Sequence, residues 1–175
     1  SEGQAYGLFF ALVANDRPAF EKLLQWTENN LAQGDLTAHL PAWQWGHRDD
    51  GSWGVMDKNP ASDADVWIAY VLGEAGRLWK ERRYTVLSNV IANRILSEET
   101  ANIPGLGITL LPGSVGFTQG KNRWRLNPSY APIQALRRLA ANDPDSAWAA
   151  VVASSITVIT ESASKGFSPD WVLFQ

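Results

Sequence analysis

The stretch ASDADVWIAYVLGEAGRLW, residues 61–79, decides the fold class. Its apolar side chains recur every three or four residues, which is the spacing of one face of an α-helix. They are Val66, Ala69, Tyr70, Leu72 and Leu78. Ser62 is followed three residues later by Asp65, a variant of the capping box that marks a helix N-terminus. The stretch therefore predicts a helix from Ser62, with Asp65 satisfying the helix start and Asp63 left to point elsewhere.

The same period extends to both sides of this stretch. Upstream, an apolar stripe of Tyr6, Phe9, Phe10 and Val13 predicts a helix over Glu2–Ala14. Asp16 is placed to cap a second helix that ends near Gly34, because Pro18 follows in the first turn. Downstream, the pattern predicts helices over Tyr84–Glu98, Tyr130–Ala141 and Asp145–Ala163.

Two segments lack this period. Prolines and glycines separate short apolar runs between Ile108 and Leu126, which indicates a β-hairpin or an ordered excursion. The connection Ala32–Ala61 is far longer than usual loops of about 4–6 residues, and long ordered loops are usually functional. The predicted fold class is all-α with a small β element, in which antiparallel helix pairs suit an α/α toroid or a bundle.

Composition excludes several function classes. A net charge of −3 and a pI near 5.3 provide no basic surface for nucleic acid. The sequence contains no run of eighteen or more apolar residues, so it predicts no membrane span. Zero cysteines exclude disulfides, Cys-ligated zinc and thiol catalysis, and two histidines among scattered acids match no metal-ligand spacing. No metal or other cofactor is predicted. A serine hydrolase is disfavoured because no Gly-x-Ser-x-Gly motif occurs.

Nine tryptophans in 175 residues point to carbohydrate. Some are expected in the core, whereas others are expected to offer the broad indole face that matches the apolar face of a pyranose. The candidates are Trp43, Trp45, Trp53 and Trp124.

Glu2 and Asp63 are the candidate carboxylates for glycoside hydrolysis, which needs one acid and a second carboxylate. The alternative for each is a purely structural role, because acids are favoured in the first turn of a helix.

The segments SEGQAYG, residues 1–7, and ASDADVWIAYVLGEAGRLW, residues 61–79, resemble the two characteristic motifs of glycoside hydrolase family 8. The resemblance continues through residues 104–107, 111–113, 124–130 and 166–171, where it is nearest to the branch of the family associated with bacterial cellulose synthesis. It implies an (α/α)6 barrel and hydrolysis with inversion. Glu2 matches the general acid, Asp63 the carboxylate that binds the distorted sugar, and Tyr130 a residue of that subsite. Trp43 and Trp124 match stacking platforms.

The resemblance implies an endo-β-1,4-glucanase with β-1,4-glucan as its partner and a periplasmic or secreted location. Residues 1–175 would form a single truncated catalytic domain, about half of the barrel, because the family's first helix and general base would lie outside it. Asp65 is expected among the substrate-binding residues. The general base could come from Asp65, from Asp170 or from a second chain. The alternative is a glucan-binding or inactive remnant. Uncovered apolar flanks at Tyr6, Phe9, Phe10 and Ile156–Ile159 would favour a homodimer or a companion fragment.

Overall fold

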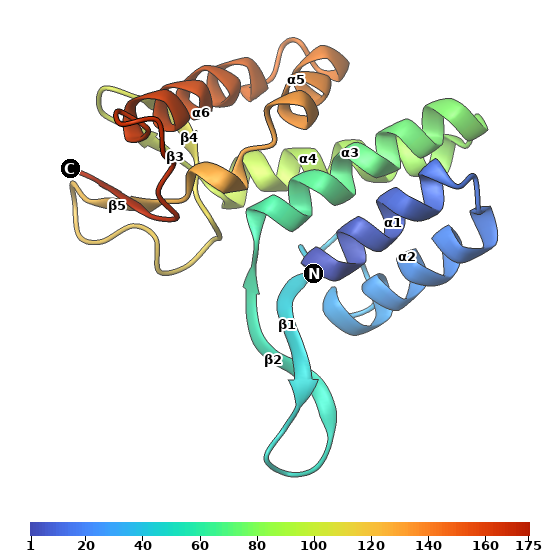
Figure 1. Cartoon of the computed structure of the whole chain (residues 1–175). Helices are drawn as coiled ribbons and strands as arrows, with labels where there is room; N and C mark the ends of the chain where they lie inside the picture. Colours follow the sequence, from blue (N-terminus) through green and yellow to red (C-terminus); the bar gives the residue numbers. More distant parts are fainter.

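Helices dominate the computed structural model, which describes all residues 1–175 (Figure 1). The six α-helices are α1 (Glu2–Val13), α2 (Arg17–Leu31), α3 (Ser62–Trp79), α4 (Arg82–Glu98), α5 (Ile133–Asn142) and α6 (Trp148–Ser162), and a short 3-10 helix η1 covers Pro128–Tyr130. Three antiparallel strand pairs complete the fold: β1 (Ala42–His47) with β2 (Trp53–Pro60), β3 (Thr100–Ile103) with β4 (Gly107–Leu110), and β5 (Trp124–Leu126) with β6 (Val172–Phe174). The predicted class is confirmed. None of the helices is long and apolar enough to cross a membrane.

Local sequence signals set the helix boundaries in two clear cases. The backbone N–H of Ala19 donates to the Asp16 carboxylate at 3.0 Å, so Asp16 caps α2 as predicted. Lys80, at a φ of 57°, ends α3 in the left-handed conformation, and α4 starts two residues later. A Cβ at Gly76 would lie 2.8 Å from the Thr85 backbone nitrogen, so glycine is what lets α3 and α4 approach closely here.

The start of α3 differs from the prediction in one respect. Ala61 occupies the N-cap position, and Ser62 is already the first helical residue. The Ser62 hydroxyl is buried without a hydrogen-bond partner. Asp65 makes no capping bond either, so the predicted capping box does not form.

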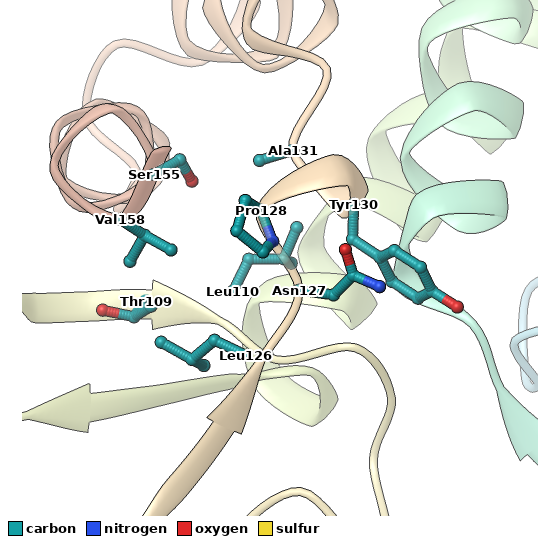
Figure 2. Close-up of a pocket in the computed structure, with 9 residues that line it drawn as sticks. All are labelled: Thr109, Leu110, Leu126, Asn127, Pro128, Tyr130, Ala131, Ser155 and Val158. Carbon is teal, nitrogen blue, oxygen red and sulfur yellow. The ribbon is translucent and has the colours of Figure 1, made fainter. Parts of the chain in front are cut away.

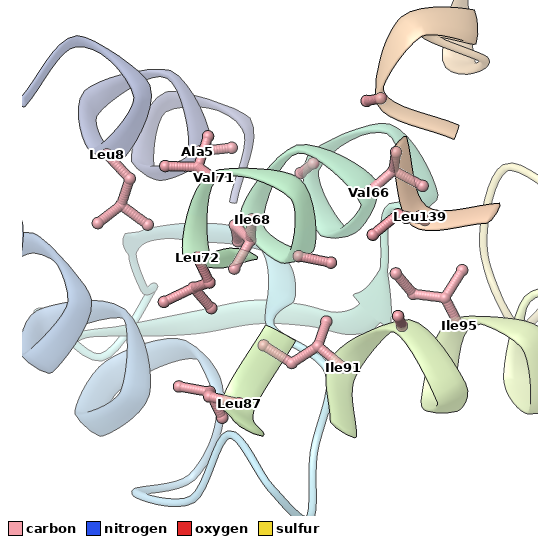
Figure 3. Close-up of a cluster of buried hydrophobic side chains, with 14 of the residues drawn as sticks. Ala5, Leu8, Val66, Ile68, Val71, Leu72, Leu87, Ile91, Ile95 and Leu139 are labelled. Atoms are coloured by element: carbon pink, nitrogen blue, oxygen red, sulfur yellow. The ribbon is translucent and has the colours of Figure 1, made fainter. Parts of the chain in front are cut away.

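The main hydrophobic core is built around α3 (Figure 3). Its buried side chains meet those of α1 on one side, α4 on another and α5 beyond. The residues labelled in Figure 3 are Ala5, Leu8, Val66, Ile68, Val71, Leu72, Leu87, Ile91, Ile95 and Leu139. A second, smaller cluster of Ile103, Leu111, Trp124 and Leu126 lies among the strand pairs near α6. The α3 stretch therefore organises the core, as its period predicts.

Helix α1 buries a different face from the predicted stripe. Its fully or nearly buried residues are Ala5, Leu8, Ala11 and Leu12. Phe10 and Val13 are exposed at 66% and 68%, and Tyr6 is also exposed. Ile156, on α6, is exposed as well. An all-round apolar helix gives no single dominant stripe, so spacing alone does not select the face that packs.

The long connection before α3 is a hairpin rather than a loop. Strands β1 and β2 project away from the helices (Figure 1). Register irregularities flank Gln44, between Ala42 and Gln44 and between Gln44 and Trp45. The β structure predicted between Ile108 and Leu126 starts earlier, at Thr100, where β3 begins and pairs with β4. Strand β5 pairs instead with β6, near the end of the sequence. Helix α6 continues through the β-branched run to Ser162.

Candidate active site

The predicted acids lie where three chain segments meet: the start of α1, the junction of β2 with α3, and η1 (Figure 1). Beside them is an open pocket, called here the aromatic pocket. It is lined by Trp43, Asp57, Asn59, Pro60, Ala61, Pro112, Phe117, Tyr130 and Trp171. Trp43 and Tyr130, both predicted from the sequence, are thus brought together from positions 87 residues apart (130 − 43).

Glu2 is the first residue of α1, and its side chain is exposed. The Tyr6 hydroxyl donates to the Glu2 carboxylate at 3.2 Å, one helical turn away. The Ser1 nitrogen donates to the Trp43 carbonyl at 2.7 Å, which fastens the start of α1 to β1. Glu2 is therefore held beside the pocket wall while its carboxyl group stays accessible to a ligand.

Asp63 is the second residue of α3 and is partly buried. Burial raises the pKa of its carboxyl group, and the nearby charge of Glu2 raises it further, whereas the backbone N–H of Ala64 opposes the shift. Its Oδ1 atom is buried and has no hydrogen-bond partner in the protein. Buried polar atoms are normally paired, so this oxygen lacks the partner that its burial calls for.

Tyr130 ends η1, whose start is capped by Asn127 through a 2.9 Å bond from the Ser129 N–H. Figure 2 shows its ring extending away from the apolar side chains that surround Pro128. Burial raises the pKa of the Tyr130 phenol, and the charges of Asp63 and Glu2 add to the shift. A neutral phenol near two carboxyl groups can donate one hydrogen bond to a sugar and accept another.

Trp43 forms one wall of the aromatic pocket and is 46% exposed. The Trp43 side chain is the main cause that lowers the pKa of Asp57, and the Asn59 N–H donates to the Asp57 carboxylate at 2.9 Å. The Asn59 side chain in turn brackets the backbone of Val115, with bonds of 2.9 and 3.1 Å. The orientation of Trp43 is therefore fixed by a chain of polar contacts.

Another part of the pocket lining is aromatic. The rings of Phe117 and Trp171 lie parallel, with centroids 6.0 Å apart and an interplanar angle of 9°. The ring centroids of Tyr130 and Trp171 are 6.1 Å apart, and Arg125 Cζ lies 4.0 Å from the centroid of the Trp171 ring. Sequence reasoning did not select Asp57, Phe117 or Trp171 as site residues. Trp171 belongs to a quoted motif, but the contact with Phe117 depends on tertiary packing.

Two predicted binding residues lie elsewhere. Trp124 is only 7% exposed and packs in the smaller hydrophobic cluster, so its ring presents no face to a ligand. Asp65 is fully buried beneath the start of α3 and cannot reach a sugar or an attacking water. Asp170 is exposed next to Trp171 but does not line the aromatic pocket. No group of three or more His, Asp or Glu side chains is arranged to hold a metal ion.

Comparison with known proteins defines what the chain is similar to. The family model of glycosyl hydrolases family 8 matches residues 1–175. The chain is 51% identical over 175 residues to an endoglucanase of Salmonella typhi and 52% identical over 178 residues to one of Escherichia coli O157:H7. All of the chain is covered in both cases, but only 47% of each relative. The chain thus spans about half the length of these relatives.

Solved structures show the same likeness. The endo-1,4-D-glucanase from Vibrio fischeri ES114 matches with a TM-score of 0.98 and 54% identity, over 99% of this chain and 50% of that one. The family 8 endoglucanase Cel10 from Klebsiella pneumoniae matches with a TM-score of 0.87 and 33% identity, over 98% of this chain and 54% of that one.

Proposed function

Because the chain belongs to glycosyl hydrolase family 8, we propose that it carries the acid-bearing part of an endo-β-1,4-glucanase site. One observation supports this most strongly: Glu2, Asp63 and Tyr130 come from three separate segments and influence one another electrostatically beside a pocket with aromatic walls. The relatives named endoglucanase support β-1,4-glucan as the substrate.

In the proposed reaction, Glu2 acts as the general acid. Its carboxylic acid gives a proton to the glycosidic oxygen as the bond from that oxygen to the anomeric carbon breaks. A water molecule attacks the anomeric carbon from the opposite face and loses its proton to a general base, which gives inversion. The exposed Glu2 carboxyl group, held by Tyr6, suits the first of these roles.

Asp63 and Tyr130 would hold the sugar at the cleavage point. The partly buried carboxyl group of Asp63 would accept a hydrogen bond from a sugar hydroxyl group, and the strength of that bond can increase as the ring distorts. Trp43 would contact a glucose unit through its ring face, and Trp171 would contribute to the wall of the same pocket. The same proposal places the six helices in about half of an (α/α)6 barrel, within a single catalytic domain over residues 1–175.

A second candidate function is glucan binding without turnover. The burial of Asp65 favours it, since Asp65 was one of the predicted sources of the base and is sealed from the pocket. A base from Asp170 or from a second chain stays a proposal, as do a homodimer, a companion fragment and a periplasmic or secreted location. The exposed Phe10 and Ile156 support the idea of a covering partner.

One experiment separates the two functions. The purified chain and its Glu2→Gln variant are incubated with carboxymethylcellulose, and reducing ends are measured; binding of cello-oligosaccharides is measured in parallel by calorimetry. Release by the parent but not by the variant supports the hydrolase. Binding by both proteins without release supports the binding module. If the parent shows neither release nor binding, the proposal is contradicted.

A further inference from the structure

Two buried carboxyl groups remain outside the proposed chemistry. Asp65 lies in the first turn of α3, and Glu99 follows the last residue of α4; both have an exposed fraction of 0%. No backbone N–H, hydroxyl or side-chain N–H donates to any of their four oxygens. Two ionised carboxylates in this state would be strongly destabilising, because buried charge needs a partner.

Each carboxyl group lies close enough to the other to change its pKa, so we infer that the partner of each is the other. A hydrogen bond between two carboxyl groups requires a proton on one of them. Helix dipoles indicate where it resides: Glu99 sits at the negative end of α4, which favours the neutral form, whereas Asp65 sits at the positive end of α3, which favours the charged form. Glu99 is therefore the donor, and Asp65 is the acceptor.

The surrounding charges agree with a retained proton. Burial is the main cause that raises the pKa of both groups. Asp63 and Glu98 add negative charge near both, and the charge of Asp65 further raises the pKa of Glu99. The Ser1 nitrogen acts in the opposite direction on Asp65 alone.

The pair closes a junction that also carries Asp63. The Leu111 N–H donates to the Glu99 carbonyl at 2.8 Å, and the Ser62 N–H donates to the Pro112 carbonyl at 3.1 Å. Residues 111–112 therefore tie the end of α4 to the start of α3 through the backbone, and the carboxyl pair ties the same two ends through side chains. Asp63 lies between Ser62 and Asp65, so its position depends on both connections.

We propose that Asp65 and Glu99 are positioning residues: a buried carboxyl pair that shares one proton and holds the first turn of α3 so that Asp63 keeps its place beside the pocket. The part of this inference that concerns sugar binding rests on the proposed function. The shared proton and the placement of Asp63 do not.

Thermal unfolding of the full chain from pH 5 to 9 tests the shared proton. The native state keeps a proton that an unfolded Glu releases near its ordinary value of 4.5, so the stability of the parent should fall as pH rises above that value. Glu99→Gln keeps a hydrogen-bond donor and removes the titration, so its melting temperature should fall less steeply, by the equivalent of about one proton. Glu98→Gln, at the neighbouring partly exposed residue, should follow the parent. Parallel curves for the parent and Glu99→Gln would overturn the proposal.

Carbon-13 NMR of the parent provides a test that needs no variant to fold. The Glu99 carboxyl resonance should report a protonated acid at pH 6.5, and titration at the ordinary value would overturn the proposal. A third measurement addresses positioning: the Asp63 resonances should shift in Glu99→Ala and return toward the parent in Glu99→Gln. Unchanged Asp63 resonances in a folded Glu99→Ala would leave no positioning role and overturn that part.

Cello-oligosaccharide affinity then links the pair to the site. Glu99→Ala should raise the Kd about ten-fold, whereas Glu99→Gln should bind with nearly the Kd of the parent. Equal affinities in the parent and Glu99→Ala would contradict the link to sugar binding. If the parent itself binds no cello-oligosaccharide, the proposed function fails, while the pH and NMR measurements still decide whether the pair exists.

Discussion

Asp63 and Asp65 stand two residues apart on the first turn of α3 and have opposite surroundings. Asp63 is only partly buried, beside the aromatic pocket, whereas Asp65 is fully buried next to Glu99. Two helical residues are about 200° apart around the axis, so adjacent acids in a motif face nearly opposite directions. The difference shows that helical phase decides which carboxyl group can meet a ligand and which one supports the fold.

The largest expected effect is at Glu2, an exposed acid that lies beside the same pocket as Asp63. Glu2→Gln keeps the shape of the side chain and removes the transferable proton, so hydrolysis of carboxymethylcellulose should fall by a factor of about 10²–10⁴. The melting temperature should hardly change, because Glu2 is exposed. Reducing-end release gives the rate, and an undiminished rate in the variant would remove Glu2 from the role of acid.

Asp63→Asn tests the same side with a smaller effect. Turnover should fall about 10- to 100-fold with little change in KM, because the carboxylate acts mainly on the distorted sugar. The pKa of Asp63 is raised, so turnover by the parent should decrease as pH falls through a value above that of ordinary Asp, because the carboxylate becomes protonated. Reducing-end release measured across pH should show this dependence in the parent, and the residual release by Asp63→Asn should lack it. A higher KM with unchanged turnover would make Asp63 a simple binding residue.

Asp65→Ala tests the sealed side. Removing the acceptor leaves the Glu99 carboxylic acid without a partner, which should lower the free energy of unfolding by about 1–3 kcal/mol. Urea unfolding measures the loss. Glu98→Ala is the matched control, because Glu98 forms only a partly exposed ion pair with Arg94 and should cost at most about 1 kcal/mol. Similar losses in both variants would show that burial does not distinguish the two acids.

The smallest expected effect concerns the pocket wall rather than the acids. Trp171→Ala should weaken cello-oligosaccharide binding by about 1 kcal/mol, since an aromatic side chain that stacks with Phe117 is lost from the pocket wall. Trp53→Ala removes an equally large side chain, 66% exposed on β2 and outside the pocket, and should leave affinity unchanged. Equal losses in the two variants would remove Trp171 from the binding surface.

The sequence predicts features that depend on neighbours along the chain. The Asp16 cap, the helical period of α3 and the placement of Glu2 and Asp63 at helix starts are all local, and the structure has them in those places. Features that depend on packing are not accessible in this way. Residue type alone does not separate Trp43 on the pocket wall from Trp124 in the core, and the partner of Asp65 is set by where α4 ends. The contact between Phe117 and Trp171 joins segments that share no pattern.

The irregular register around Gln44 limits how this protein can vary in evolution. The bulged segment aims the side chains of β1, and Trp43 lies inside it, next to the pocket. Removal of one residue between Ala42 and Trp45 would rotate Trp43 to the other side of the ribbon, because side chains alternate along a strand. Residues added at the tip, between His47 and Trp53, would change only the length of the projection. Related sequences should therefore vary freely in length at the tip of this hairpin and conserve the residue count at its base.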